Sequence, residues 1–187
     1  MDLLKTYFRY LKNPAIALQG LLEKRSLAGA CVGYLAAALG WVIFFNTGDG
    51  LSVSSFVLKT TIVFVAELTT GYFIASLSGL FLDLFRLKVT PSALFILVGS
   101  AGFIKGLLIC GALISAAFPA AKLAYFSPLW LLLVLGLQLA YLTRGLSRVS
   151  GLSAWRALGA WLSGFIPVGC AFGCLFVFFI WGILLSV

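Results

Sequence analysis

The sequence contains no histidine and only five acidic residues among its 187. Because histidine is the commonest general base and a frequent metal ligand, its absence excludes Ser-His and Cys-His catalytic sites. No glycine-rich phosphate loop is present, and Asp49 lies in the turn sequence Gly48-Asp49-Gly50 without a second aspartate in an apolar run. We therefore predict no catalytic residue, no metal site, no cofactor and no enzymatic activity.

Cysteine is also scarce, and its four positions are Cys31, Cys110, Cys170 and Cys174. Cys170 and Cys174 are one helical turn apart, a spacing compatible with a thiol pair. However, no further cysteine or histidine completes a metal-binding set around them. We favour the interpretation that all four are small apolar packing residues.

Charged residues make up only 10% of the chain, whereas hydrophobic residues make up 63%. A soluble globular domain is nearer a quarter charged. Several apolar runs are long enough to cross a hydrocarbon core of about 30 Å, which takes roughly 20 helical residues. Since helices satisfy their backbone hydrogen bonds internally, we predict an all-α integral membrane protein. The five predicted spans cover residues 27–45, 54–82, 92–117, 128–143 and 159–185.

The segments between these spans are short, so residues 1–187 are predicted to form a single membrane domain with residues 1–26 as its lead-in. The lead-in has no small-residue cleavage site, so no removable signal peptide is expected. If the N-terminus is cytoplasmic, that side carries ten Lys and Arg residues and the opposite side only Lys122. This bias predicts a cytoplasmic N-terminus and a C-terminus on the far side.

Apolar and aromatic residues recur at helical spacing in the first twelve residues, MDLLKTYFRYLK, beside a basic face. This pattern is typical of an amphipathic helix that lies on an anionic membrane surface. We expect the cytoplasmic basic residues to contact partners, although they could equally well serve only to set the topology. They are Lys5, Arg9, Lys12, Arg86, Lys88, Arg144, Arg148 and Arg156.

Three pairs of glycines at four-residue spacing are candidate helix-packing positions: Gly29 and Gly33, Gly102 and Gly106, Gly169 and Gly173. Small residues let helix backbones approach closely where lipid supplies no hydrophobic drive for association. Together the pairs predict a tight five-helix bundle, and a homodimer face is the alternative use. Pro167 is expected to kink the fifth span.

Two opposite charges lie deep in neighbouring predicted spans. Glu67 is about 20 Å along the second span, and Lys105 is a similar distance along the third, which runs the other way. Consecutive spans joined by a short loop are usually neighbours, so we predict an ion pair between Glu67 and Lys105. Lys59, eight residues before Glu67 on roughly the same face, is a second candidate partner, and a neutral Glu67 is a further alternative. The role of the pair is either to fix the helix register or to couple a proton or substrate. A larger polar cluster is a further prediction, with Lys59, Thr69, Thr70 and Gln138 as its members.

The chain resembles the Yip1 (YIPF) family of five-span membrane proteins. The similarity lies in three segments: KNPAIALQGLLEKRSLAGACVGYL, residues 12–35; GLFLDLFRLKVTPSALFILVGSAG, residues 79–102; and FSPLWLLLVLGLQLAYLTRGLSRVSGLSAWRAL, residues 126–158. The glycine pair often found between the family's second and third spans is replaced by Arg86-Leu87-Lys88-Val89. The Asp-Leu-Tyr-Gly-Pro motif and the long N-terminal region of eukaryotic members are missing, so the chain is more similar to short prokaryotic members.

The resemblance implies a scaffold or partner-binding protein in membrane organisation or trafficking. Eukaryotic relatives bind Rab-type GTPases, and some prokaryotic members accompany ABC-type export systems. We therefore expect a location in a prokaryotic cytoplasmic (inner) membrane, with lipid and other membrane proteins as partners and no nucleic acid. The alternative function is a small transporter, a lipid-handling protein or an accessory subunit of one, with Glu67 and Lys105 at its centre.

Overall fold

The structure, a computed structural model, describes residues 26–47, 52–87, 89–118 and 126–185, with side chains up to residue 175. This part of the chain is helical and contains no strand. Its helices are α3 (Leu27–Phe45), α4 (Val53–Leu84), α5 (Pro91–Lys105), α6 (Leu108–Ala117), α7 (Phe126–Ser150) and α8 (Ala154–Leu185). When α5 and α6 are counted together, five helical segments are long and apolar enough to cross a membrane.

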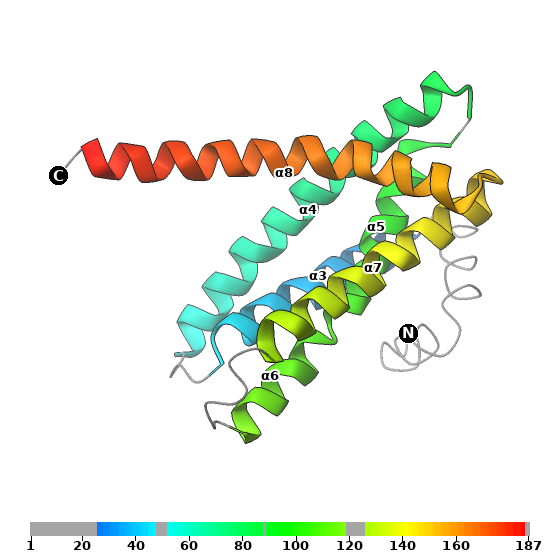
Figure 1. The fold of residues 1–187 in the computed structure, drawn as a ribbon. Helices are drawn as coiled ribbons and strands as arrows, with labels where there is room; N and C mark the ends of the chain where they lie inside the picture. The colour runs from blue at the N-terminus through cyan, green and yellow to red at the C-terminus, as the bar shows by residue number, and fades with distance from the viewer. Residues whose placement is uncertain (1–25, 48–51, 88, 119–125, 186–187) are drawn as a thin grey trace.

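The helices α3, α4, α5 and α7 lie side by side, with α5 in contact with the other three (Figure 1). Residues 96–104 of α5 are buried without a break, because α5 is enclosed by neighbours on all sides. The main hydrophobic core forms around α5 and includes Tyr34 of α3, Leu82 of α4 and Leu142 of α7. The predicted all-α membrane fold is therefore confirmed in its helical architecture.

Helix starts follow local sequence signals. Ser26, Ser52 and Thr90 each accept a hydrogen bond from a backbone N–H of the first turn that follows, which satisfies one of the donors left free there. Pro91 occupies the first turn of α5, where its missing N–H costs nothing.

The end of α4 uses an arginine where helices usually place glycine. Arg86 has a φ of 58°, in the left-handed region. The N–H of Arg86 donates to the carbonyl of Asp83, and the N–H of Leu87 donates to the carbonyl of Leu82. These two bonds are those of a Schellman motif, in which glycine is the preferred residue at the left-handed position. The turn therefore carries backbone strain at Arg86.

Glycines bring α3 and α5 into backbone contact. A Cβ added at Gly33 would lie 1.9 Å from the carbonyl oxygen of Gly99, and one added at Gly102 would lie 2.5 Å from the carbonyl oxygen of Gly33. Gly29 and Gly106 are buried as well. The predicted role of the first two glycine pairs in tight packing therefore agrees with this geometry.

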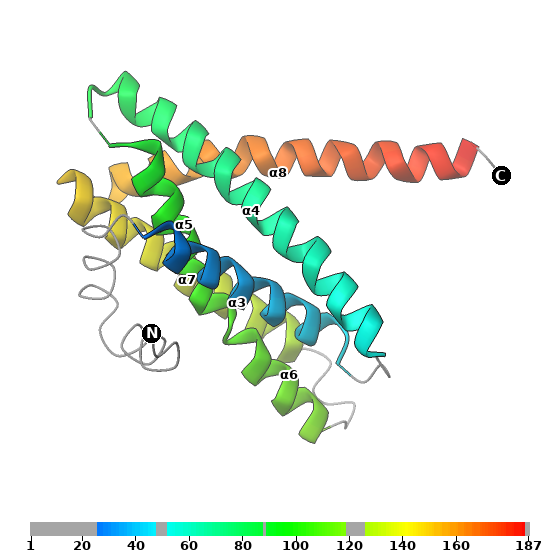
Figure 2. The same cartoon turned by 180° about the vertical axis from the view of Figure 1, so that it is seen from behind.

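The helix α8 packs against the bundle only through its first half. Ala157, Ala160 and Trp161 are fully buried there, and Gly164 fits against Ser78 and Ile74 of α4. Farther along, Figures 1 and 2 show α8 extending away from the other helices. Side chains are exposed at 59% for Ile166, 52% for Phe172 and 65% for Leu175, so this half is not part of the bundle core.

The structure differs from the prediction at Pro167, and the packing predicted for Gly169 and Gly173 is not seen within the described residues. The helix α8 runs through Pro167 without interruption and is drawn straight, so the expected kink is absent. Nothing lies within 4 Å of a Cβ added at Gly169 or Gly173, so this pair does not pack helices together within the described chain. The glycine pair has no neighbour because α8 has left the other helices before it reaches these residues.

The third predicted span, 92–117, is not one continuous helix. The helix α5 ends at Lys105 and α6 begins at Leu108. Around this break the N–H groups of Gly106, Leu107, Ile109 and Cys110 donate to carbonyls three residues earlier, which is the tighter 3₁₀ pattern. The indole N–H of Trp130 in α7 donates to the Leu107 carbonyl at 3.1 Å, so a side chain supports the backbone where the α-helical ladder is interrupted.

Candidate polar site in the bundle

Three helices contribute one side chain each to a polar cluster at the break. Lys105, the last residue of α5, places its Nζ 2.6 Å from Oε1 and 2.9 Å from Oε2 of Glu67 in α4. The indole N–H of Trp41 in α3 donates to the same Oε1 at 2.7 Å. The predicted pairing of Glu67 with Lys105 is thus present in the structure, with Trp41 as a third member.

The cluster is largely shielded from its surroundings. The side chains of Lys105 and Glu67 are only 12% and 16% exposed. Lys105 Nζ also lies 5.5 Å from the centre of the Trp41 ring, within the range of a cation–π contact. Each charge at this depth would be costly alone, whereas together the two form charge-assisted hydrogen bonds and neutralise each other.

Backbone packing holds Lys105 in place. A Cβ added at Gly40 of α3 would lie 2.4 Å from the Lys105 carbonyl oxygen. Gly40 directly precedes Trp41, so the same close approach of α3 and α5 brings the indole to the carboxylate. The ion pair therefore sits where three helices meet and where α5 stops.

The other residues of the predicted polar cluster do not join this pair in any hydrogen bond that the structure shows. Lys59 Nζ donates to the side-chain oxygen of Asn46 at the end of α3. The hydroxyl of Thr69 donates to the Val65 carbonyl of its own helix, and Thr70 is half-buried on α4. Gln138 is buried in α7. The larger cluster was predicted because these polar residues lie within apolar spans, but Lys59 is about 12 Å from Glu67 along α4 and bonds Asn46, and Thr69 bonds its own helix.

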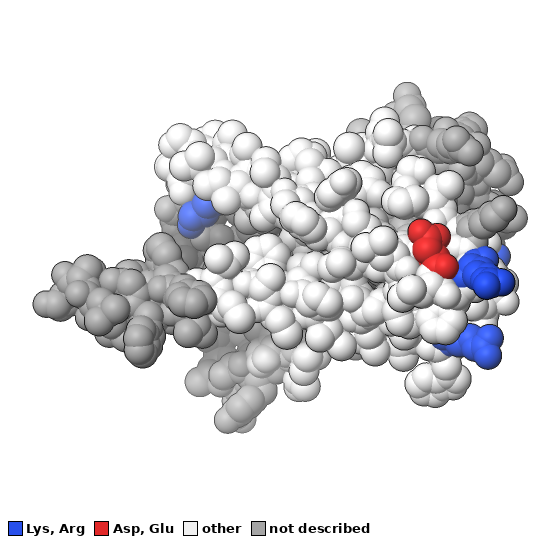
Figure 3. Space-filling model, turned by 90° about the horizontal axis from the view of Figure 1, so that it is seen from above, with Lys and Arg blue, Asp and Glu red and all other residues white. Residues whose placement is uncertain are grey.

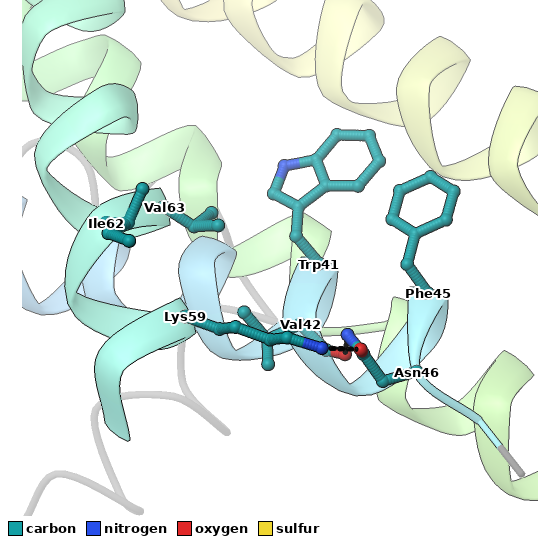
Figure 4. Close-up of a pocket in the computed structure, with 7 residues that line it drawn as sticks. All are labelled: Trp41, Val42, Phe45, Asn46, Lys59, Ile62 and Val63. Carbon is teal, nitrogen blue, oxygen red and sulfur yellow. Dashed lines mark hydrogen bonds between the residues drawn. The ribbon is translucent and has the colours of Figure 1, made fainter. Parts of the chain in front are cut away.

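A cavity of about 190 Å³ lies between α3 and α4, near the C-terminal end of α3 and the N-terminal end of α4 (Figure 4). It is almost wholly apolar and is bordered by Trp41, which also contacts Glu67. Its lining consists of Trp41, Val42, Phe45 and Asn46 of α3 and Lys59, Ile62 and Val63 of α4.

Basic residues gather at the other end of the helices. Arg86 follows α4, Arg144 and Arg148 lie in the last turns of α7, and Arg156 lies in the first turn of α8; all four are exposed. Figure 3 shows basic groups and an acidic group toward one end of the visible face, a basic group toward the other end, and an uncharged middle. Lys5, Arg9, Lys12 and Lys88, and with them the predicted amphipathic lead-in, lie outside the described residues.

Sequence reasoning missed Trp41 and Asn46. Tryptophan in an apolar helix resembles any large hydrophobic residue, and only the depth of Trp41 relative to Glu67 would have suggested the hydrogen bond. Asn46 is the first residue after α3, a position that usually indicates only the end of a helix. Within the part of the chain that the structure describes, no group of three or more Cys, Asp or Glu residues is placed to hold a metal ion.

Comparison with known proteins adds no relative. No family model, no curated protein and no solved structure matches this chain.

Proposed function

We propose that this chain is a non-enzymatic, multi-pass membrane protein that acts as a scaffold by binding other membrane proteins. Membership of the Yip1 family, a prokaryotic inner-membrane location and a cytoplasmic N-terminus are parts of the same proposal and rest on the sequence patterns. The observation that supports the binding function is that the second half of α8 extends away from the other helices and exposes apolar side chains.

The second half of α8 repeats a feature that joins helices elsewhere in this chain. In the bundle, Gly33 and Gly102 each lie against the backbone of a neighbouring helix. Each of these two glycines belongs to a pair with four-residue spacing, and Gly169 and Gly173 form a third such pair. No atom of the described residues lies within 4 Å of a Cβ added at Gly169 or Gly173. Since small residues at this spacing admit a second helix backbone, the surface around them suits a helix of a partner protein. We call residues 166–175 the distal face of α8.

The closed ion pair also favours a scaffold. Both carboxylate oxygens of Glu67 accept hydrogen bonds from Lys105, and Oε1 also accepts one from Trp41, so the two charges are paired with each other inside the bundle. A pair engaged in this way fixes the register of α3, α4 and α5 and leaves no free acid or base at the centre.

Leucine substitutions on the distal face test the proposal. Purification of G169L/G173L in mild detergent should lose proteins that co-purify with the unmodified chain, because the added side chains block close helix approach. The chain's own fold should be unaffected, since no atom of the described residues lies within 4 Å of a Cβ added at either glycine. G136L, at an exposed glycine of α7 that likewise contacts nothing, is the matched control and should retain the partner. Retention by G169L/G173L would contradict the proposal.

The break between α5 and α6 favours a second candidate function, a small transporter or lipid-handling protein. Transporter sites are typically built where membrane helices are interrupted, and Lys105 lies at such a point beside Glu67. A hydrophobic carbodiimide, which modifies accessible protonated carboxyls, distinguishes the two functions. Modification of Glu67 in intact membranes would favour transport, whereas a scaffold with a closed ion pair should resist it.

A further inference from the structure

The cavity between α3 and α4 combines an apolar lining with one cation. Phe45 and Ile62 border it and are 64% and 59% exposed, so it opens sideways from the helices rather than into the bundle. Lys59 is its only charged residue. Figure 4 shows the Lys59 side chain extending across the cavity floor toward Asn46.

The side chain of Asn46 is fixed so that its oxygen faces Lys59. Its Nδ2 donates to the Val42 carbonyl at 2.7 Å, and its Oδ1 accepts the bond from Lys59. This partner orients the ammonium group without neutralising it, because an amide carries no charge. An ammonium has three N–H donors, and Asn46 accepts from one of them. Among the described residues, no carboxylate is placed against Lys59.

The depth of Lys59 matches the level of lipid headgroups. Lys59 precedes Glu67 by eight residues, which corresponds to about 12 Å along α4. Glu67 lies close to the middle of the 32-residue helix α4. Half of the hydrocarbon core is about 15 Å thick, so Lys59 lies near the boundary between acyl chains and headgroups. The apolar part of the cavity then lies at acyl-chain depth.

We propose that this cavity binds an anionic phospholipid, with the phosphate at Lys59 and part of one acyl chain against Phe45 and Ile62. A phosphate accepts the free ammonium hydrogens in charge-assisted bonds, and the apolar wall takes the chain. The volume of about 190 Å³ is smaller than cavities that enclose a whole drug-sized ligand, so only a segment of the lipid enters and the rest stays in the bilayer.

Native mass spectrometry of the full chain tests this site. The protein is extracted from bilayers that contain equal amounts of phosphatidylglycerol and phosphatidylcholine with identical acyl chains. Unmodified protein should retain phosphatidylglycerol about tenfold better, the lower range for a hydrogen bond to a charged group. K59M should lose this preference, and K59R should keep it. Equal retention of both lipids by the unmodified protein, or an unchanged preference in K59M, would overturn the proposal.

Two further measurements distinguish a lipid site from a site for free anions and from pairing of Lys59 with Asp49. Excess inorganic phosphate should leave phosphatidylglycerol retention unchanged, whereas displacement would show a site for free anions and refute the lipid. D49N changes the acid that precedes Lys59 by ten residues, between α3 and α4, and should also leave retention unchanged. If D49N prefers phosphatidylglycerol and the unmodified protein does not, Lys59 pairs with Asp49 and the proposal is wrong. Should K59M fail to insert, K59Q removes the same charge with a polar side chain and should lose the preference, and an unchanged preference in K59Q would overturn the proposal.

Discussion

Neutralising the Glu67–Lys105 pair one partner at a time should destabilise the bundle far more than neutralising both. The E67Q variant removes the counter-ion of Lys105, whose side chain is only 12% exposed in the unmodified protein. An unpaired charge at the centre of a membrane helix costs about 3 kcal/mol on insertion scales, and breaking a buried pair costs about 3–5 kcal/mol. We expect a loss of about 3 kcal/mol for E67Q. The loss for K105M should be smaller, because Trp41 still donates to the Glu67 carboxylate.

The double variant E67Q/K105M removes both charges and should lose mainly packing. Its loss of unfolding free energy should be at least about 2 kcal/mol smaller than the sum of the two single losses. Reversible unfolding in mixed micelles by increasing sodium dodecyl sulfate provides the free energies. Additive losses would refute direct pairing and would leave the two residues as independent polar groups in the bundle.

Two further substitutions test the helix packing and the turn after α4. G33A should lose about 3 kcal/mol of unfolding free energy, because the new Cβ would lie 1.9 Å from the Gly99 carbonyl oxygen. G136A contacts nothing and should be neutral or gain up to about 1 kcal/mol, so equal effects of the two would contradict the α3–α5 packing. R86G should gain about 1 kcal/mol by relieving the left-handed φ of 58°, whereas R86A should show no such gain. If R86A and R86G behave alike in the same unfolding assay, the inferred strain at this turn is wrong.

The number and approximate position of the long apolar helices could be predicted because polar segments separate the apolar runs, and most of these runs reach the roughly 20 residues needed to cross a bilayer. The ends were less predictable. The helix α7 extends to Ser150 although its apolar run ends near residue 143, since arginine and serine continue a helix once its core turns are packed. The interruption after Lys105 has no proline to indicate it, and its support comes from Trp130, more than twenty residues later.

The ion pair was predictable from depth alone, because opposite charges at matching positions on adjacent antiparallel helices have few other partners. Its third member, Trp41, depends on how α3 rotates about its axis, which follows from the contact between Gly40 and the Lys105 carbonyl. The course of α8 could not be predicted. Its small residues indicate helix packing but not whether the other helix belongs to the same chain.

Site-specific photo-crosslinking at Phe172 tests the proposed scaffold function most directly. Phe172 lies on the distal face of α8 and is 52% exposed. A benzophenone side chain placed there in intact membranes should give a protein adduct that is absent when it is placed at Leu133, an exposed residue of α7 (51%). The adduct should disappear in the G169L/G173L background. Lipid adducts alone at Phe172, or an adduct only with a second copy of this chain, would contradict a scaffold that binds other membrane proteins through α8.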